Sequence, residues 1–190
     1  PDKGLAFTKN ISVSFESSKI NALVEIFEEE IRKITSLNIN FLINDGNSSD
    51  LIFEINESLN KEEYQIDINE KILVSAGSYN ALVMAKNSLL QLVTKKNESI
   101  VFPLIKIKDY PDSSYRGLLI DLARVWHDIE TLKDIIDLAS FYKINYIQLH
   151  LTDDQAFTFP TEKYPKLPTP DRPYSKKDFR ELVEYAKLRG

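Results

Sequence analysis

The feature that most constrains the fold is a pair of apolar runs separated by a helical stripe, within residues 115–155. Leu118–Leu122 is one run, interrupted only by Asp121, and Ile144–Leu151 is the other. Two strands joined through a helix are parallel, because a parallel pair needs a long crossover connection. The stretch therefore predicts a β-α-β unit. Its helical stripe consists of five residues at helical spacing, Leu132, Ile135, Ile136, Ala139 and Tyr142.

Polar residues stand at the carboxyl ends of both predicted strands. Asp121 and Arg124 follow the first apolar run, and His150, Asp153 and Asp154 follow the second. Sites in parallel α/β folds form at this edge of the sheet. The candidate binding residues are therefore Arg124 and Asp153, and the candidate supporting residues are Asp121, His150, Asp154 and Trp126.

Arg124 presents a fork of donors that suits neighbouring hydroxyl groups. The alternative is an arginine that pairs with Asp121 or Asp153 to hold the sheet together, and one side chain can do both. Asp153 and Asp154 are adjacent, so in an extended segment they point to opposite sides. We therefore expect Asp153 to face a pocket and Asp154 to bond within the loop or at a helix end.

Each of the other candidates can be interpreted either as a structural or as a functional residue. His150 beside two aspartates could suggest a metal site, but a His-x-x-Asp spacing has low specificity. We predict no metal and no cofactor, and a hydrogen-bonded packing role for His150. Trp126, the only tryptophan, could stack on a sugar or fill the core. Asp121 interrupts an apolar strand, so it needs hydrogen-bond partners.

The rest of the second half predicts one more helix and no further strand. Ser175 and Asp178 make a capping-box-like start, and the helix runs to about Gly190. Parallel sheets bury both faces, so two parallel strands with two helices do not form a complete sheet. This half therefore indicates a truncated barrel, or a sheet completed by dimerisation of an unrelated α/β domain. The apolar face of this helix would carry Phe179, Leu182, Val183 and Ala186.

The first half predicts an α+β domain with no cluster of candidate site residues. The Asp-Tyr-Pro-Asp sequence at residues 109–112 marks its end, which gives domains 1–112 and 113–190. Residues 1–10 show no periodic signal. Helices are expected from Ser17 or Ser18 through Ile34, and from Ser78 to about Val93. Strands are expected at Ile11–Phe15, Asn38–Ile43, Leu51–Ile55, Glu63–Ile68, Ile72–Ser75 and Ile100–Ile107.

Composition excludes several classes of function. The net charge is −5, which argues against a nucleic-acid partner, because such a partner needs a basic face. No apolar run reaches 18 residues, so no membrane span is expected. The chain has no cysteine, which removes disulfides and thiolate chemistry. It begins at Pro1 without a signal peptide, and we expect a fragment of an exported bacterial protein, periplasmic or extracellular.

Three motifs carry a resemblance to a known family. Arg116–Arg124 reads R-G-L-L-I-D-L-A-R, Leu149–Gln155 reads L-H-L-T-D-D-Q, and Glu184–Gly190 reads E-Y-A-K-L-R-G. Together they resemble glycoside hydrolase family 20, the β-N-acetylhexosaminidases. The resemblance implies a small α+β domain (1–112) followed by the first two β/α units of a truncated (β/α)8 TIM barrel (113–190), an α+β and α/β chain.

The resemblance also implies an activity and a partner. Family members remove terminal N-acetylhexosamine (GlcNAc or GalNAc) from glycans, and the substrate's own acetamido group attacks the anomeric carbon. It implies that Arg124 holds hydroxyls of the terminal sugar and that Asp153 lines the same pocket. The catalytic Asp-Glu pair is expected beyond Gly190, in the sequence that completes the barrel. This chain would then hold no catalytic residue and be inactive alone, with a glycan as partner.

Two positions depart from the family pattern. Val125 stands where a histidine usually follows the motif arginine, and Gln148-Leu149-His150 stands where His-Trp-His is frequent. These departures put the shape of the sugar pocket in question. They leave open a non-catalytic carbohydrate-binding or protein-binding module, and an Asp-Glu pair in the continuation of the chain would favour the enzyme.

Overall fold

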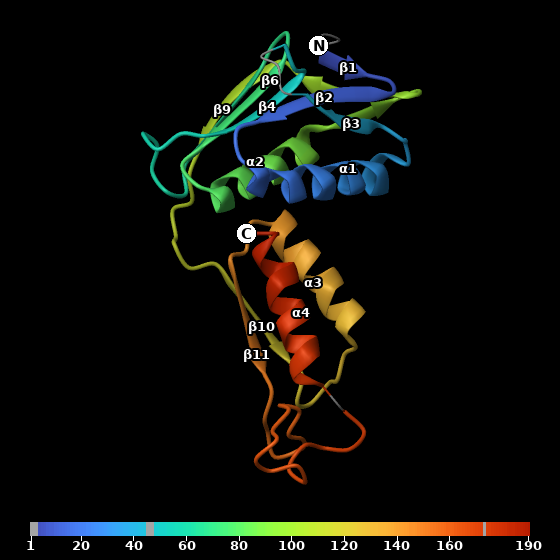
Figure 1. Cartoon of the computed structure of the whole chain (residues 1–190), viewed down its shortest axis with the longest axis vertical. Coiled ribbons are helices and arrows are strands. Elements are labelled where there is room, and N and C mark those ends of the chain that lie inside the picture. Colours follow the sequence, from blue (N-terminus) through green and yellow to red (C-terminus); the bar gives the residue numbers. More distant parts are fainter. Residues whose placement is uncertain (1–3, 45–47, 173) are drawn as a thin grey trace. The chain divides into compact units, whose positions relative to one another are not determined.

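The protein is described by a computed structural model covering residues 4–44, 48–172 and 174–190. Its chain forms two compact units, residues 1–112 and 113–190. The first unit contains strands and two long helices, and the second contains two strands and two helices (Figure 1). Each unit is considered by itself below.

The described strands of the first unit form a three-stranded and a six-stranded sheet. The small sheet has the order β1-β8-β7 and is antiparallel. The large sheet has the order β3-β2-β4-β6-β5-β9, parallel from β3 to β6 and antiparallel at β5 and β9. The bounds are β1 Gly4–Phe7, β2 Asn10–Phe15, β3 Asn40–Ile43, β4 Leu51–Ile55, β5 Tyr64–Ile68, β6 Ile72–Ala76, β7 Thr94–Lys96, β8 Ser99–Pro103 and β9 Ile105–Asp109.

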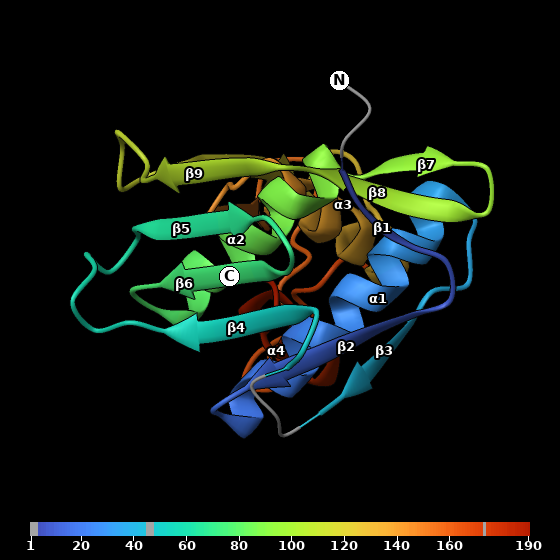
Figure 2. The same ribbon diagram turned by 90° about the horizontal axis from the view of Figure 1, so that it is seen from above.

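Two helices, α1 (Asn21–Thr35) and α2 (Tyr79–Leu92), cover one face of the large sheet (Figure 2). The ring of Phe27 in α1 packs edge-on against Phe41 and Phe53 of the sheet, with centroids 5.2 and 6.4 Å apart. The Ser78 side chain caps α2 by accepting a hydrogen bond from the Ala81 N–H, 3.2 Å away. This unit therefore closes its own core.

Several expectations for this unit are confirmed and three are wrong. The hairpin β5–β6 and the Ser78 cap are confirmed. The segment predicted as one strand, Ile100–Ile107, is two strands in different sheets, since Pro103 has no N–H to continue a ladder. Residues 4–7 form β1 on β8, although residues 1–10 carry no local signal; residues 1–3 lie outside the described residues. Ile34 recurs at helical spacing with Phe27 and Ile31, which predicts it on the apolar stripe of α1, yet it is exposed.

The second unit contains a parallel pair of strands with two helices packed on one face. The strands are β10 (Gly117–Asp121) and β11 (Tyr146–His150), and the helices are α3 (Ile129–Phe141) and α4 (Lys176–Lys187). The strands pair in register from Gly117 with Tyr146 to Asp121 with His150, so the β-α-β prediction is confirmed. The core between sheet and helices is formed by Ile120, Leu122, Leu132, Ile136, Tyr174 and Leu182.

In the second unit, the start of α4 was predicted correctly from the sequence, whereas the burial of two apolar residues was not. Ser175 and Asp178 form the expected capping box of α4. Tyr142 and Val183, assigned to apolar stripes, are exposed: Tyr142 lies at the C-cap of α3, and Val183 lines an apolar hollow that is open to solvent. In the described part of the chain, no helix has the length and apolar character that a membrane crossing requires.

Candidate functional site

The candidate site is built on a turn that follows β10. Asp121, the last residue of β10, accepts hydrogen bonds through Oδ1 from the backbone N–H groups of Ala123 (3.1 Å) and Arg124 (3.0 Å). The backbone carbonyl of His150, the last residue of β11, accepts from the N–H groups of Leu122 (2.9 Å) and Ala123 (3.1 Å). The parallel register thus fixes the turn against the end of the neighbouring strand.

The Arg124 side chain joins carboxylates from both strand ends. Its Nη1 lies 2.8 Å from Oδ2 of Asp121, and its Nη2 lies 2.6 Å from Oδ2 of Asp153. A guanidinium has five N–H groups, and these contacts within the described residues use two of them. The side chain is 52% exposed, so the other three donors can reach a ligand.

The charges of this cluster stabilise one another. A backbone hydrogen bond from Arg124 and the arginine's charge lower the pKa of Asp121. The hydrogen bond to Asp121 and the charge of Asp153 raise the pKa of Arg124. The arginine is therefore a permanent cation held between two ionised carboxylates.

The carboxyl groups of Asp153 and Asp154 influence each other, although the extended-strand argument expected them to point to opposite sides. The segment bends at residues 154–155, and a hydrogen bond between the two carboxyl groups lowers the pKa of Asp153 to about 2 and raises the pKa of Asp154. The expectation failed because it assumed extended backbone where the chain turns. Asp154 is thus a direct partner of the residue that holds Arg124.

His150 closes the cluster on its β11 side. Its Nε2 lies 3.2 Å from Oδ2 of Asp153, so the expected hydrogen bond is present, while about one third of the side chain is exposed. Among the described residues, no group of three or more His, Cys, Asp or Glu side chains is arranged to hold a metal ion. The candidates Arg124, Asp121, Asp153, Asp154 and His150 are therefore brought together as one network of charges.

Trp126 packs against an aromatic residue, Tyr174. Its ring stacks on Tyr174, with centroids 5.8 Å apart and an interplanar angle of 29°. The Tyr174 hydroxyl donates to the backbone carbonyl of His127, and burial raises the pKa of this tyrosine. Tyr174 also contacts Phe179. Trp126 thus contributes to the packing of the loop after β10, while its ring remains about one third exposed.

Sequence reasoning missed two residues that contact this loop, Arg172 and Tyr174. Arg172 donates through Nη1 to the backbone carbonyls of Ala123 and Arg124, the second at 3.4 Å. These contacts span 48 residues or more along the chain, and no spacing or motif marks them. Only the path of the loop between β11 and α4 brings them to the turn.

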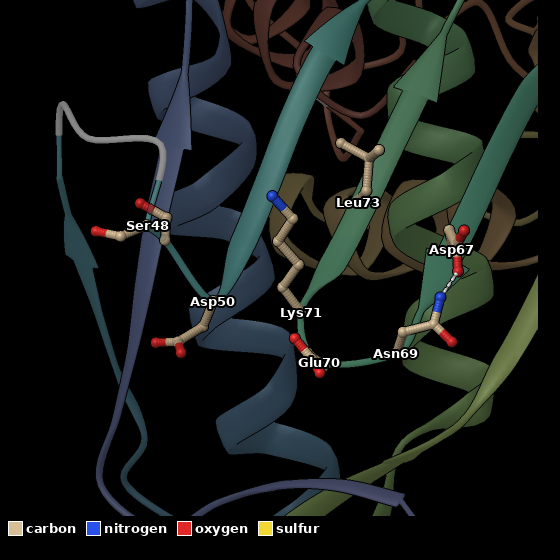
Figure 3. Close-up of a pocket in the computed structure, with 8 residues that line it drawn as sticks. Ser48, Asp50, Asp67, Asn69, Glu70, Lys71 and Leu73 are labelled. Carbon is tan, nitrogen blue, oxygen red and sulfur yellow. Dashed lines mark hydrogen bonds between the residues drawn. The ribbon is translucent and has the colours of Figure 1, made fainter.

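A hollow in the first unit is lined by none of the candidate residues. It encloses about 570 Å³ beside the amino ends of β4 and β6, the edge opposite to the one where parallel sheets build sites (Figure 3). Asp50, which lines it, already accepts hydrogen bonds from the N–H (2.8 Å) and hydroxyl (2.6 Å) of Ser12. Asn69 donates to Asp67. Asp50, Asp67 and Asn69 are therefore already hydrogen-bonded within the protein.

Comparison with known proteins covers both units. Residues 1–110 match the model of glycosyl hydrolase family 20, domain 2, and residues 113–190 match that of the glycosyl hydrolase family 20 catalytic domain. A beta-hexosaminidase of Vibrio furnissii is 30% identical over 167 residues, which are 87% of this chain and 27% of that protein. The mouse beta-hexosaminidase subunit alpha is 32% identical over 138 residues, 68% of this chain and 26% of that protein. The chain thus spans about a quarter of the length of these curated relatives.

Solved structures agree with the family models. The GH20 exo beta-N-acetylglucosaminidase of Vibrio harveyi, in complex with N-acetylglucosamine, superposes with a TM-score of 0.86 at 25% identity, over 100% of this chain and 33% of that one. The beta-N-acetylhexosaminidase of Bacteroides fragilis gives a TM-score of 0.85 at 26% identity, over 100% of this chain and 41% of that one. Together with the motifs at the ends of β10 and β11, these matches show that the chain belongs to glycosyl hydrolase family 20.

Proposed function

We propose that this chain is the N-terminal part of a β-N-acetylhexosaminidase that removes terminal N-acetylhexosamine from glycans. The observation that carries the proposal is the position of Arg124, whose guanidinium is held by Asp121 and Asp153 at the carboxyl ends of two adjacent parallel strands. The names of its relatives, beta-hexosaminidases and a β-N-acetylglucosaminidase bound to N-acetylglucosamine, support the substrate class.

The proposal includes a (β/α)8 barrel of which β10-α3-β11-α4 are the first two units. Three observations support it. The two strands are parallel and in register, and α3 and α4 pack on the same face of the pair. The other face exposes Leu119, Tyr146 and Gln148, which would point into the interior of a closed barrel. The strands that close the barrel would come from the sequence beyond residue 190.

In this proposal Arg124 and Asp153 bind and orient the terminal sugar. The remaining N–H donors of Arg124 would bind neighbouring hydroxyls of the sugar. The carboxylate of Asp153 can accept a hydrogen bond from a sugar hydroxyl. Fixed donors and acceptors reduce the entropy lost when the sugar is positioned for reaction. The acid that protonates the leaving oxygen and the residue that orients the acetamido group lie outside this chain, which contains no Asp-Glu dipeptide.

The first test is an assay of the full-length protein with a chromogenic N-acetylglucosaminide. Arg124→Ala is expected to lower kcat/KM roughly a hundredfold, because it removes two charge-assisted hydrogen bonds worth about 1.5 kcal/mol each. Arg124→Lys keeps the charge without the fork and should recover only part of the loss. Arg180→Ala, which removes an exposed arginine of α4, is the matched control. Unchanged kcat/KM in Arg124→Ala would contradict the proposed role.

The isolated chain of 190 residues provides a second test. It is expected to show no turnover, since the residues that perform the chemistry lie elsewhere. Turnover that disappears in Arg124→Ala would refute this division of roles. A non-catalytic binding module is the alternative that the departures at Val125 and Gln148 leave open, and it predicts a full-length protein that binds the amino sugar without hydrolysing the glucosaminide.

A further inference from the structure

The turn that presents Arg124 is held from two sides. On one side, its N–H groups are bound by the Asp121 carboxylate and by the backbone carbonyl of His150. On the other side, its carbonyl oxygens at Ala123 and Arg124 face the guanidinium of Arg172. A turn whose backbone N–H and carbonyl groups are bound to fixed partners on both sides has few alternative conformations.

Arg172 is itself fixed by the loop that carries it. Its backbone N–H donates to the carbonyl of Thr169 (3.2 Å), and Thr169 in turn bonds Phe157 twice, through its N–H (2.9 Å) and its hydroxyl oxygen (3.1 Å). Tyr174, two residues further on, is buried against Trp126 and donates to the carbonyl of His127. Arg172 and Tyr174, both in the loop between β11 and α4, therefore contact the loop after β10 at two points.

We propose that Arg172 is a positioning residue of the sugar site, acting through Arg124. This inference rests on the proposed function, because it assumes that Arg124 binds the sugar. Asp121 and Asp153 set the direction of the Arg124 side chain, while Arg172 sets the position of the backbone from which that side chain starts. A guanidinium suits this task, since its donors can reach two neighbouring carbonyl oxygens while it stays charged.

The experiment is a double-mutant cycle in the full-length protein, with the dissociation constant of N-acetylglucosamine measured by calorimetry. Arg172→Ala is expected to weaken binding about tenfold, because it removes the charged donor that holds the carbonyl oxygens of Ala123 and Arg124. In an Arg124→Ala background, the same Arg172→Ala substitution should change the dissociation constant less than twofold. A residue that acts only through Arg124 must lose its effect when Arg124 is absent.

Controls separate this role from a general loss of stability. Arg180→Ala should leave binding unchanged, and Arg172→Lys, which keeps a charged donor at the turn, should recover part of the affinity. If Arg172→Ala does not fold, the cycle is run with Arg172→Gln. An equal loss of affinity with and without Arg124, or no loss at all, would overturn the inference. A normal affinity in Arg124→Ala alone would instead count against the proposed function.

Discussion

Arg124 is oriented by its two carboxylate neighbours. Asp121 and Asp153 each bind one end of its guanidinium, at 2.8 and 2.6 Å. A side chain that is already held loses less conformational freedom when a sugar binds, which favours affinity. The sequence predicted this pairing as one alternative and sugar binding as the other; the structure shows the pairing, and in the proposed function the pairing orients Arg124 for the sugar.

The bend at Asp153 and Asp154 could not be predicted from residue types alone. Adjacent residues alternate only in extended backbone, and the chain leaves that conformation after β11. The residues of the site were predictable because the carboxyl ends of parallel strands share one edge. The hydrogen bond between the two carboxyls, and the contact of Arg172 with the turn, depend on loop paths that carry no periodic signal.

The Asp153–Asp154 pair predicts a pH dependence of stability. Asp153 has a folded pKa of about 2 against an ordinary value of 3.8, so its ionisation stabilises the folded state above pH 3.8, and this stability is lost as the pH falls toward 2. Asp154→Ala removes the hydrogen bond that is the largest cause of this shift. The melting temperature of the full-length protein should then depend less steeply on pH between 2 and 4 in calorimetric scans.

Two further features sharpen that prediction. The raised pKa of Asp154 has the opposite sign: its contribution is present at low pH and is lost as the pH rises through the raised value. Its removal should therefore also flatten the profile just above pH 4. Asp134→Ala, at an exposed position of α3, is the control and should keep the original slope. An unchanged slope in Asp154→Ala would show that the two carboxyls do not interact.

At the scale of elements, local sequence patterns were sufficient to predict a helix or strand where one of its faces is buried within its own unit. The β10-α3-β11 unit was predictable because apolar residues recur with period 3.6 between two apolar runs. β1 and β7 were not, since Gly4–Phe7 gains its strand conformation from pairing with β8, nearly a hundred residues later. β8 and β9 belong to different sheets. The sequence of either strand alone does not indicate which sheet it joins.

The cap of α2 gives a prediction at this scale. Ser78 accepts a hydrogen bond from the Ala81 N–H and donates one to the carbonyl of Lys61, 2.6 Å away. Ser78→Ala should lower the free energy of unfolding by about 1 kcal/mol, the usual cost of losing an N-cap. Urea unfolding followed by circular dichroism measures this in residues 1–112, the unit that is expected to unfold cooperatively. Ser18→Ala, at an exposed position in the turn before α1, should change the free energy by less than about 0.5 kcal/mol, and equal losses would contradict the assignment of the cap.

At the scale of the whole chain, the two units differ in how completely they close a core. Residues 1–112 bury apolar side chains from both sheets and both helices, among them Phe27, Phe53 and Phe102. In residues 113–190, one face of the strand pair exposes Leu119 and Tyr146. The other face borders an apolar hollow of about 110 Å³ between sheet and helices. Parallel strands need cover on both faces, so the proposed barrel would supply the cover that this strand pair lacks on one face.

The two units should therefore behave differently when they are produced separately. Residues 1–112 are expected to unfold in one cooperative urea transition and to bind little of a dye that reports exposed apolar surface. Under the proposed barrel, residues 113–190 are expected to bind the dye and to unfold without a sharp transition, because one face of the strand pair has no cover within this unit. Light scattering completes the test. A cooperative, dye-free monomer of 113–190 would contradict the truncated barrel, whereas a cooperative dimer would favour a sheet completed by a second copy of the chain.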